Sequence, residues 1–109
     1  MSTIRSSCEI DVVFRTAKRV AHPLVIAFIA RTPQGRDQNG RVAFVAGKKL
    51  GNAVVRNRSR RVLREAYAIA QGPWPGRDVV LMARPTTGKT TPAKVAAGVQ
   101  SVIERSGDR

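Results

Sequence analysis

The sequence predicts an α+β fold: one domain in which helices and a β-sheet form a two-layer sandwich. Its 109 residues are about one domain's worth, and we find no internal repeat or linker. Segments with the apolar period of helices alternate with short apolar runs typical of strands. Apolar residues make up 42% and charged residues 25%, a globular rather than a disordered composition. We therefore expect one domain over residues 1–109, with the order helix, strands, helix, strand, helix.

The first half of the chain is predicted to contain one short helix and two strands. Two serines can cap a helix, and apolar residues recur at helical spacing behind them, so residues 7–18 are predicted as the first helix. The apolar runs 24–30 and 41–47 are predicted as strands. Segment 32–40, rich in Gly, Asn, Asp and Pro, is predicted as a turn. We expect these two strands to pair as a hairpin with a long connection.

The second half is predicted to contain a long helix, a buried strand and a last helix. Gly51 and Asn52 precede the long helix, expected over about 53–70 and ended by the GPWPG segment. DVVLMA, 78–83, is a short apolar strand, and a loop follows it. Pro92 suits the first turn of the last helix, with an apolar stripe of Val95, Val99, Val102 and Ile103.

The net charge favours an anionic partner. Twenty Lys and Arg face seven Asp and Glu, which gives a formal charge of +13 and points to nucleic acid or an anionic membrane surface. Cys8 is the single cysteine, so no intramolecular disulfide can form, which fits a reducing compartment. We see no secretory signal, and the longest apolar run is too short to span a bilayer. We expect a soluble cytoplasmic protein.

The positive charge is concentrated between Lys48 and Arg64, where seven Lys and Arg occur without an acidic residue. With Arg56 set at zero and about 100° per residue, Arg60, Arg64, Asn57 and Arg61 fall within about 140°. Val55, Val62, Ala66 and Ala70 fall on the opposite arc, between about 240° and 320°, and Arg58 lies at the margin. The helix is thus predicted to dock its apolar face on a sheet and to show a cationic stripe to solvent.

An ordinary solvated helix face is a weaker explanation, because such faces mix charges of both signs. Arginines stacked at i,i+4 repel one another, and an anionic partner would offset that cost. Arginine also predominates over lysine, and its planar fork suits bidentate contact with phosphate and stacking on bases. A membrane-binding face would need exposed bulky apolar residues beside the charge, which we do not find. Nucleic acid is the better partner.

The segment KKLGNAVVRNRSRRVLREAY, 48–67, resembles the signature of the protein component of bacterial ribonuclease P. The signature is a Lys-rich turn, Gly-x-Ala-Val, Arg-Asn-Arg, two more basic residues and an Arg one turn later. RVAFVAGKK and RDVVLMARP resemble the strands on either side, so the resemblance covers most of the chain. It implies RNA-binding residues at Lys48, Lys49, Arg56, Asn57, Arg58, Arg60, Arg61 and Arg64.

The resemblance also implies a fold and a mechanism. The fold would be a four-stranded sheet with a left-handed βαβ crossover through the Arg-rich helix, with a very short fourth strand near residues 19–21. The holoenzyme would remove the 5′ leader of precursor tRNA, with the catalysis done by a large RNA subunit. Mg²⁺ would be held mainly by that RNA and not by the protein alone. The partners would be the catalytic RNA and precursor tRNA, without membrane or DNA.

A cleft between the first helix and the sheet would hold the single-stranded leader, because apolar and aromatic surfaces stack unpaired bases. Carried over by position, Phe14 is the aromatic residue of this cleft, although it can equally be plain core. Ile10 stands where a second Phe is common, and Ala27 where a Tyr is common. Phe28 is the other candidate for the cleft.

Other sites and functions are less favoured. TGKTT, 87–91, follows a strand and precedes a helix, but Ala83 stands where a phosphate-binding loop needs Gly, although Lys89 can still meet RNA phosphate. Trp74 is assigned to capping the core rather than to RNA. The chief alternative function is a general rRNA-binding or ribosomal-type protein. A protein-only nuclease would need gathered carboxylates, and a DNA-binding regulator would mix more base-reading residues into its helix.

Overall fold

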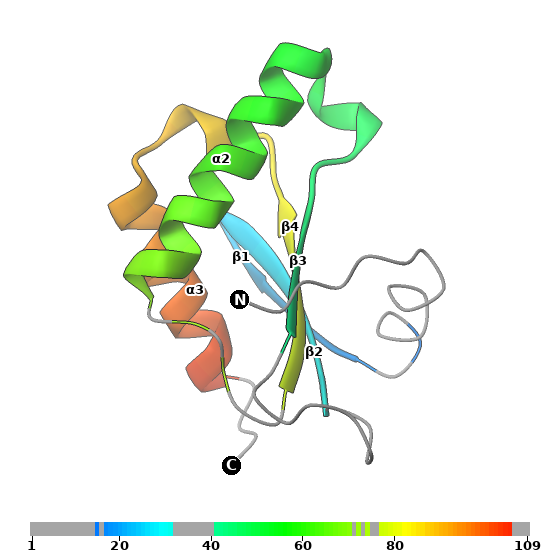
Figure 1. Ribbon diagram of the computed structural model, residues 1–109, viewed down its shortest axis with the longest axis vertical. Coiled ribbons are helices and arrows are strands. Elements are labelled where there is room, and N and C mark those ends of the chain that lie inside the picture. The colour runs from blue at the N-terminus through cyan, green and yellow to red at the C-terminus, as the bar shows by residue number, and fades with distance from the viewer. Residues whose placement is uncertain are drawn as a thin grey trace.

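A computed structural model of the chain describes residues 15, 17–31, 41–70, 72, 74 and 77–105. Among them, four strands and two long helices follow one another as Figure 1 shows. Two short 3₁₀ turns, η1 and η2, precede the helices. The elements are β1 Lys18–His22, β2 Val25–Arg31, β3 Arg41–Val45, η1 Lys48–Leu50, α2 Ala53–Ile69, β4 Arg77–Ala83, η2 Thr87–Lys89 and α3 Pro92–Arg105.

The strands form one sheet in the order β1-β2-β4-β3. β1 and β2 are antiparallel, β2 and β4 are antiparallel, and β3 and β4 are parallel. The predicted hairpin of segments 24–30 and 41–47 is therefore wrong, because β4 lies between them. Four consecutive residues of β4, from Asp78 to Leu81, are buried, and a strand that is apolar on both faces is most stable at the centre of a sheet.

β3, α2 and β4 form the βαβ unit that the resemblance implies. With the strands upright in Figure 1, β3 passes in front of β4 and α2 lies to their left, so the crossover is left-handed. Right-handed connections are the rule for parallel neighbours, and the sequence pattern by itself gave no sign of this exception. The crossover carries the basic helix onto the same face of the sheet as α3.

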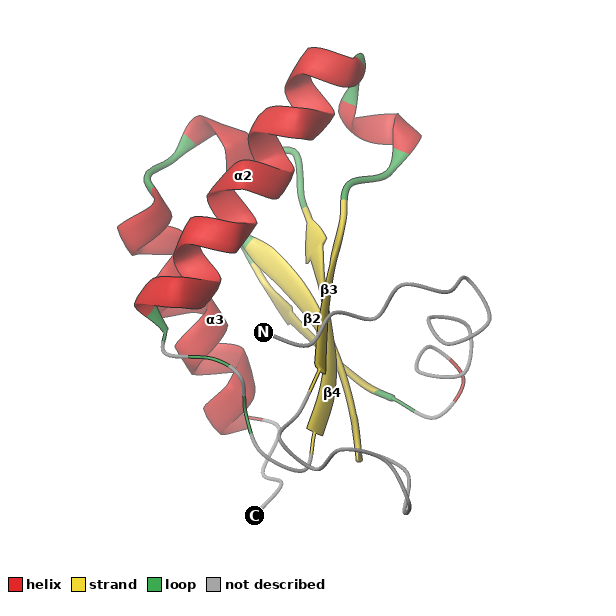
Figure 2. Cartoon of the chain, in the orientation of Figure 1, coloured by secondary structure: helices red, strands yellow, loops and turns green. Residues whose placement is uncertain are grey.

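The two helices cover one face of the sheet, as Figure 2 shows. Leu63 and Tyr67 of α2 and Val99 of α3 pack there with the alternate strand residues that point toward them, including Val25, Ala27, Ile29, Val42, Val79 and Leu81. The side chains between these point to the other face, which we call the outer face, where Ala43 and Val80 are buried beside Phe28 and Val45. The expected two-layer α+β architecture is confirmed for the described residues.

The ends of the predicted elements shift where tertiary pairing competes with local pattern. The first helix was expected to reach Lys18, but Lys18 begins β1 and pairs with Ile29. Arg15 is helical, and the rest of that prediction up to residue 14 lies outside the described residues. The short fourth strand expected near 19–21 is present as β1. The remaining predicted helices and strands agree with the structure to within about one residue, except that 46–47 lies beyond β3.

An aromatic row closes the edge of the core beside β3. The ring of Tyr67 meets those of Phe44 and Trp74 edge to face, each at a centroid distance of 5.6 Å. Gly72 passes so close to this row that a Cβ there would lie 2.2 Å from Tyr67 Cε1. Trp74 is half-buried against the core. The core-capping assignment of Trp74 is consistent with this packing, and the indole can report on folding.

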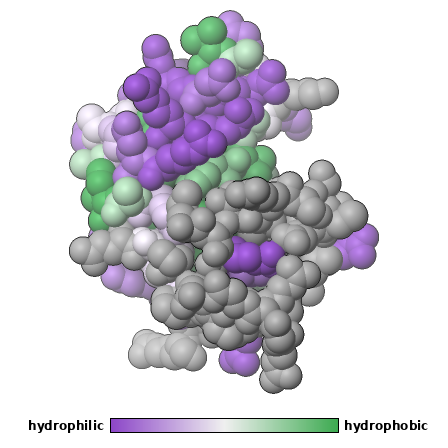
Figure 3. Space-filling view, viewed as in Figure 1, coloured by the Kyte–Doolittle hydropathy of each residue, from purple (hydrophilic) through white to green (hydrophobic). Residues whose placement is uncertain are grey.

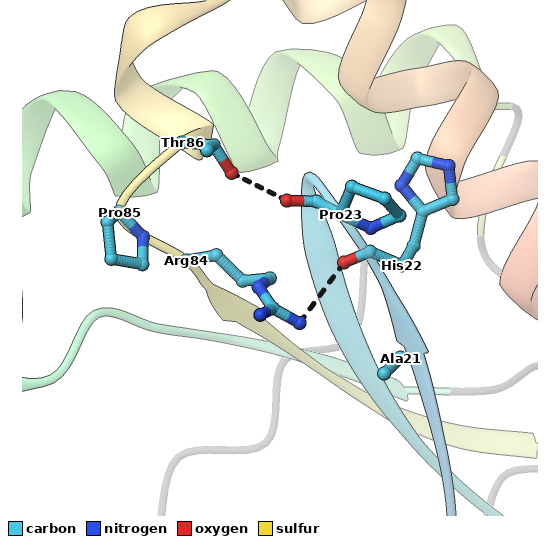
Figure 4. A pocket seen from close by; sticks show the side chains of 6 residues that line it. All are labelled: Ala21, His22, Pro23, Arg84, Pro85 and Thr86. Carbon is cyan, nitrogen blue, oxygen red and sulfur yellow. Dashed lines mark hydrogen bonds between the residues drawn. The ribbon is translucent and has the colours of Figure 1, made fainter.

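The turn between β1 and β2 is fastened to the segment after β4. Arg84 Nη1 donates to the carbonyl of His22 at 3.4 Å, and Thr86 Oγ1 donates to that of Pro23 at 2.6 Å, as Figure 4 shows. Arg105 Nη2 donates to the carbonyl of Ala21 at 2.7 Å. These residues, apart from Arg105, line an open pocket of about 540 Å³ together with Pro85.

The imidazole of His22 lies in the same turn and accepts a hydrogen bond in its neutral form. Its Nδ1 accepts a hydrogen bond from the backbone N–H of Leu24 at 3.1 Å, and a Cβ at Gly98 would lie 2.7 Å from the same atom. Burial, and secondly the charge of Arg105, lower the pKa of His22 below its ordinary value of 6.5. The folded protein therefore favours the unprotonated ring.

We predict that the protein loses stability as the pH falls below 6.5. Between that value and the lower pKa of folded His22, the unfolded chain binds more protons than the folded one, so acid favours unfolding. The contribution is complete above 6.5. His22→Asn keeps an acceptor for Leu24 but does not titrate. The difference in urea midpoint between the two proteins, measured from pH 8 to pH 5, should therefore shrink toward acid; a constant difference would contradict this.

Candidate nucleic-acid interface

The basic helix begins at a well-formed cap. Asn52 is the N-cap of α2, and its side-chain Oδ1 accepts from the backbone N–H of Val55 at 3.1 Å. Gly51 before it has φ +132°, a conformation that residues with a Cβ rarely adopt. This Gly-Asn pair turns the chain out of η1 and fixes the direction of α2. The first turn carries no acidic residue, so the positive end of the helix adds to the arginine charge.

Most of the predicted arginine stripe lies on the surface of α2. Asn57, Arg58, Arg61 and Arg64 are exposed, and Arg56 and Arg60 are half-buried. Hydrophilic side chains accordingly gather over α2 in Figure 3. Val62, Ala66 and Ala70 are buried, as predicted, and Leu63 and Tyr67 are buried with them, but the prediction is wrong for Val55. That side chain is 41% exposed, and Val54 beside it is 69% exposed, because α2 extends past the end of the sheet at this point.

Contacts with neighbours hold several side chains of the stripe in place. Arg60 Nη1 donates to Asn57 Oδ1 at 3.0 Å, one turn back along the helix. The Arg64 guanidinium lies over the Phe44 ring, 5.8 Å from its centroid, a favourable cation–π arrangement. Arg56 Nε is buried, and no hydrogen-bond partner for it is found among the described residues. Asn57 and Phe44 thus reduce the entropy that Arg60 and Arg64 would lose on binding an anion.

The lysines of the signature lie apart from this stripe. Lys48 and Lys49 belong to η1, and Lys49 is exposed at a pocket of about 570 Å³. The other residues lining it are mostly apolar and come from three segments of the chain: Ile26, Gly47, Leu50, Met82, Ala83, Arg84 and Pro85. Ile26 and Met82 pair across β2 and β4 with their side chains on the outer face. The signature therefore supplies cations to two different surfaces.

Phe28 also lies on the outer face. It pairs with Val80 of β4, which pairs in turn with Ala43 of β3, so an apolar row crosses three strands. Ala27 points the opposite way and is fully buried under the helices, so a larger aromatic residue at that position would have to displace core. Of the three residues expected in the cleft, Phe28 is on the outer face, and Ile10 and Phe14 lie outside the described residues.

Arg84 is a further cation of this region that the sequence analysis did not assign. It follows β4, and its side chain reaches the carbonyl of His22 while lining both pockets. Nothing in its local sequence marks it, apart from its place at the end of the strand RDVVLMA. Its position depends on β4 pairing with β2, which the expected hairpin of β2 and β3 did not contain.

The described residues do not offer a metal site. Glu65, Asp78 and Glu104 lie on three different elements, and the Asp78 carboxylate is held by Arg41 at 2.7 Å. Within the described ranges, no three His, Cys, Asp or Glu side chains come together. Mg²⁺ prefers several oxygen ligands in octahedral geometry, so this donor set does not fit it. In the same part of the chain, neither helix is long and apolar enough to cross a membrane.

Known proteins share both the sequence and the fold. The family model for ribonuclease P matches residues 1–107. The ribonuclease P protein component of Exiguobacterium sibiricum is 31% identical over 105 residues, which cover 95% of this chain and 89% of that protein. That of Gluconacetobacter diazotrophicus is 40% identical over 79 residues, which cover 69% of this chain and 68% of that protein.

Two solved structures have the same arrangement of elements. The Staphylococcus aureus RNase P protein superposes with a TM-score of 0.80 at 21% identity, covering 97% of this chain and 95% of that one. The Thermotoga maritima RNase P protein superposes with a TM-score of 0.78 at 20% identity, covering 96% and 97%. At these identities the structures support the fold, and the sequence match supplies the family. The chain therefore belongs to the family of ribonuclease P protein components.

Proposed function

We propose that this chain is the RNA-binding protein subunit of a ribonuclease P ribonucleoprotein, and that it assists a catalytic RNA in removing the 5′ leader from precursor tRNA in the cytoplasm. The observation that carries the proposal is the exposed cationic face of α2, in a chain that belongs to this family. A structured RNA presents the dense phosphate charge that such a face needs to offset its own repulsion.

The catalytic RNA binds along α2. Arg60, Arg61 and Arg64 meet its phosphates, and the hydrogen bond to Asn57 holds the Arg60 side chain in place. Guanidinium groups make bidentate, charge-assisted hydrogen bonds to phosphate oxygens. This recognition follows the shape of the RNA backbone rather than its sequence, since a stripe of arginines offers few groups that read base edges.

The leader lies on the outer face of the sheet, which is the face opposite the two helices. Phe28, half-buried at the end of the apolar row, offers an aromatic ring on which an unpaired base stacks. Lys49 and Arg84 stand beside the adjoining pocket, where they can hold the phosphates that connect those bases. The two RNA surfaces are then separated by the sheet itself, so one protein can contact catalyst and substrate together.

The chain supplies positioning rather than chemistry. Its described carboxylates are dispersed, and Asp78 is engaged by Arg41, so cleavage is assigned to the RNA. Mg²⁺ is likewise assigned to the RNA, where it would supply the activated water and stabilise the leaving oxygen. The role of the arginines and lysines is to lower the repulsion between two polyanions, so that substrate binds at a lower Mg²⁺ concentration.

Reconstitution tests this function directly. Purified protein would be combined with a bacterial ribonuclease P RNA and a 5′-labelled precursor tRNA at low Mg²⁺, with RNA alone and protein alone as controls. Release of the intact leader should require both components. Cleavage by the protein alone would contradict the assignment of chemistry to the RNA. Binding of the RNA without any gain in cleavage would instead favour the general rRNA-binding protein.

We predict that Phe28→Leu weakens binding of a precursor with a long leader about 3- to 10-fold in the reconstituted holoenzyme, because leucine keeps only part of a base–aromatic contact worth about 1–3 kcal/mol. Leucine preserves the apolar packing against Val80 and Ala43, so the protein should stay folded. Mature tRNA and a precursor with a one-nucleotide leader serve as controls. Equal losses with all three RNAs would mean that Phe28 acts only in the core.

A further inference from the structure

The η2 turn is fixed against the rest of the fold by a buried threonine. Thr87 is fully buried, and its hydroxyl donates to the carbonyl of Leu24 and accepts from the backbone N–H of Arg84 at 2.8 Å. The backbone N–H of Lys89 donates to the carbonyl of Thr86 at 3.1 Å. The TGKTT segment is thus an ordered turn, tied to the β1–β2 connection, rather than a phosphate loop that waits for a nucleotide.

Gly88 at the centre of this turn lies against α2. A Cβ at Gly88 would lie 3.1 Å from Ser59 Oγ and 3.7 Å from Arg58 Cδ. Ser59 is buried and donates its hydroxyl proton to the carbonyl of Val55 at 3.0 Å, so it has little freedom to withdraw. The missing side chain at Gly88 therefore allows η2 to approach α2 and lets the stem of Arg58 run along the turn.

This approach brings the η2 turn, which carries a second cation, next to Arg58. Lys89 directly follows Gly88, and both Lys89 and Arg58 are exposed. They stand on the η2 side of α2, whereas Arg64 leans over Phe44 on the β3 side. A helix with its side chains is about 10–12 Å wide, so cations on its two sides cannot reach the same phosphate.

We propose that Arg58 and Lys89 form a second phosphate-binding cluster, which grips a different backbone segment of the catalytic RNA from the one held by Arg60 and Arg64. The proposal rests on the proposed function, and it adds a residue outside the signature. Two clusters on opposite sides of α2 would clamp the helix between two RNA strands. Such a clamp fixes how the whole protein is rotated about the axis of α2 relative to the RNA. A single stripe of phosphate contacts would leave that rotation free.

Binding measurements test the contribution of Lys89. The affinity for a bacterial ribonuclease P RNA would be measured for Lys89→Gln, Lys89→Arg and Arg58→Gln, with Lys94→Gln as the matched control on α3. Lys89→Gln should weaken binding about 3- to 10-fold at moderate salt and reduce the slope of log K against log salt by about 0.7–0.9, the value for one released counterion. Lys89→Arg should bind as the unchanged protein does.

Gly88→Ala separates position from charge. The added methyl group presses on Ser59, so the turn should shift and RNA binding should weaken although every cation remains.

For Lys89→Gln the urea midpoint should stay the same, because Lys89 is exposed. If Lys89→Gln loses no more RNA affinity than Lys94→Gln does, the cluster is overturned. The proposed function would still stand in that case if Arg60→Ala with Arg64→Ala weakens RNA binding. If the unchanged protein fails to bind this RNA, the proposed function falls and the cluster with it.

Directed cleavage tests whether two RNA segments are held. With Cys8 changed to Ser, cysteines introduced by Lys89→Cys and, separately, Arg64→Cys would carry a tethered iron chelate that generates hydroxyl radicals. We expect the two positions to cut separate groups of nucleotides in the catalytic RNA. Cuts at one shared group would overturn the clamp.

Discussion

Replacing Arg60 and Arg64 together with alanine is expected to weaken binding to the catalytic RNA about 10- to 100-fold at moderate salt, because two phosphate contacts and their released counterions are lost. The slope of log K against log salt should become shallower by about 1.4–1.8. Both side chains are held in place before binding: Arg64 lies over the Phe44 ring, and Arg60 donates a hydrogen bond to Asn57. Filter binding or fluorescence anisotropy over a salt series would measure both quantities.

The matched control removes two cations from another part of the surface. Arg31→Ala with Lys94→Ala changes the net charge by the same amount at exposed positions of β2 and α3. The control should lower affinity only slightly, through the general field of the protein. Because Arg64 also contacts Phe44, circular dichroism should confirm that the fold persists. If both double variants lose affinity equally, overall charge rather than the stripe accounts for binding.

Asp78→Ala is expected to destabilise the protein by about 3–5 kcal/mol, because it breaks a buried ion pair by removing one of its two charges. Arg41 Nη2 lies 2.7 Å from Asp78 Oδ2 and Nε lies 3.4 Å from Oδ1. The two side chains are 13% and 2% exposed. The loss is a large part of the roughly 5–15 kcal/mol that holds a small domain folded, so the variant should be partly unfolded on mild heating.

Urea unfolding followed by the fluorescence of Trp74 would measure this loss, since the indole packs against Tyr67 of the core. The control replaces both partners with apolar residues, Arg41→Leu with Asp78→Leu, which removes the charges together. The free energy of unfolding of that variant should be closer to that of the original protein than the value for Asp78→Ala is, because replacing both members of a buried ion pair costs less than removing one. A loss below about 1 kcal/mol for Asp78→Ala would mean that solvent screens the pair as it does on a surface.

Within the described residues, α2 and α3 were the most predictable elements. α2 and α3 carry apolar residues at helical spacing over several turns, with Asn52 and Pro92 at their starts. Their local sequence therefore predicts where each helix begins and ends. β1 was less certain, because LysArgValAlaHis has one buried residue and forms a strand by pairing with β2. The pairing of β3 was predicted wrongly. Strand partners depend on where the crossover helix carries the chain, and no local pattern contains that information.

In the candidate interface, too, some features were predictable from the sequence and others were not. The stripe on α2 was predictable because one helix fixes the relative directions of Arg60, Arg61 and Arg64. The exposure of Val55 was not, since it depends on how far α2 extends beyond the sheet. Lys49 was grouped with the arginines by its place in the signature, yet it lies at the pocket next to Ile26 and Met82.

The sequence by itself determined the fold class, the cationic face of α2 and the resemblance to the ribonuclease P protein, because each depends on residues that are close together along the chain. Tertiary structure alone decided that β4 separates β2 from β3, that Arg84 reaches the β1–β2 turn, and that Gly88 of the η2 turn lies against Arg58. The physical reason is that side chains from distant segments become neighbours only when apolar faces pack, and that packing optimises burial over the whole chain at once.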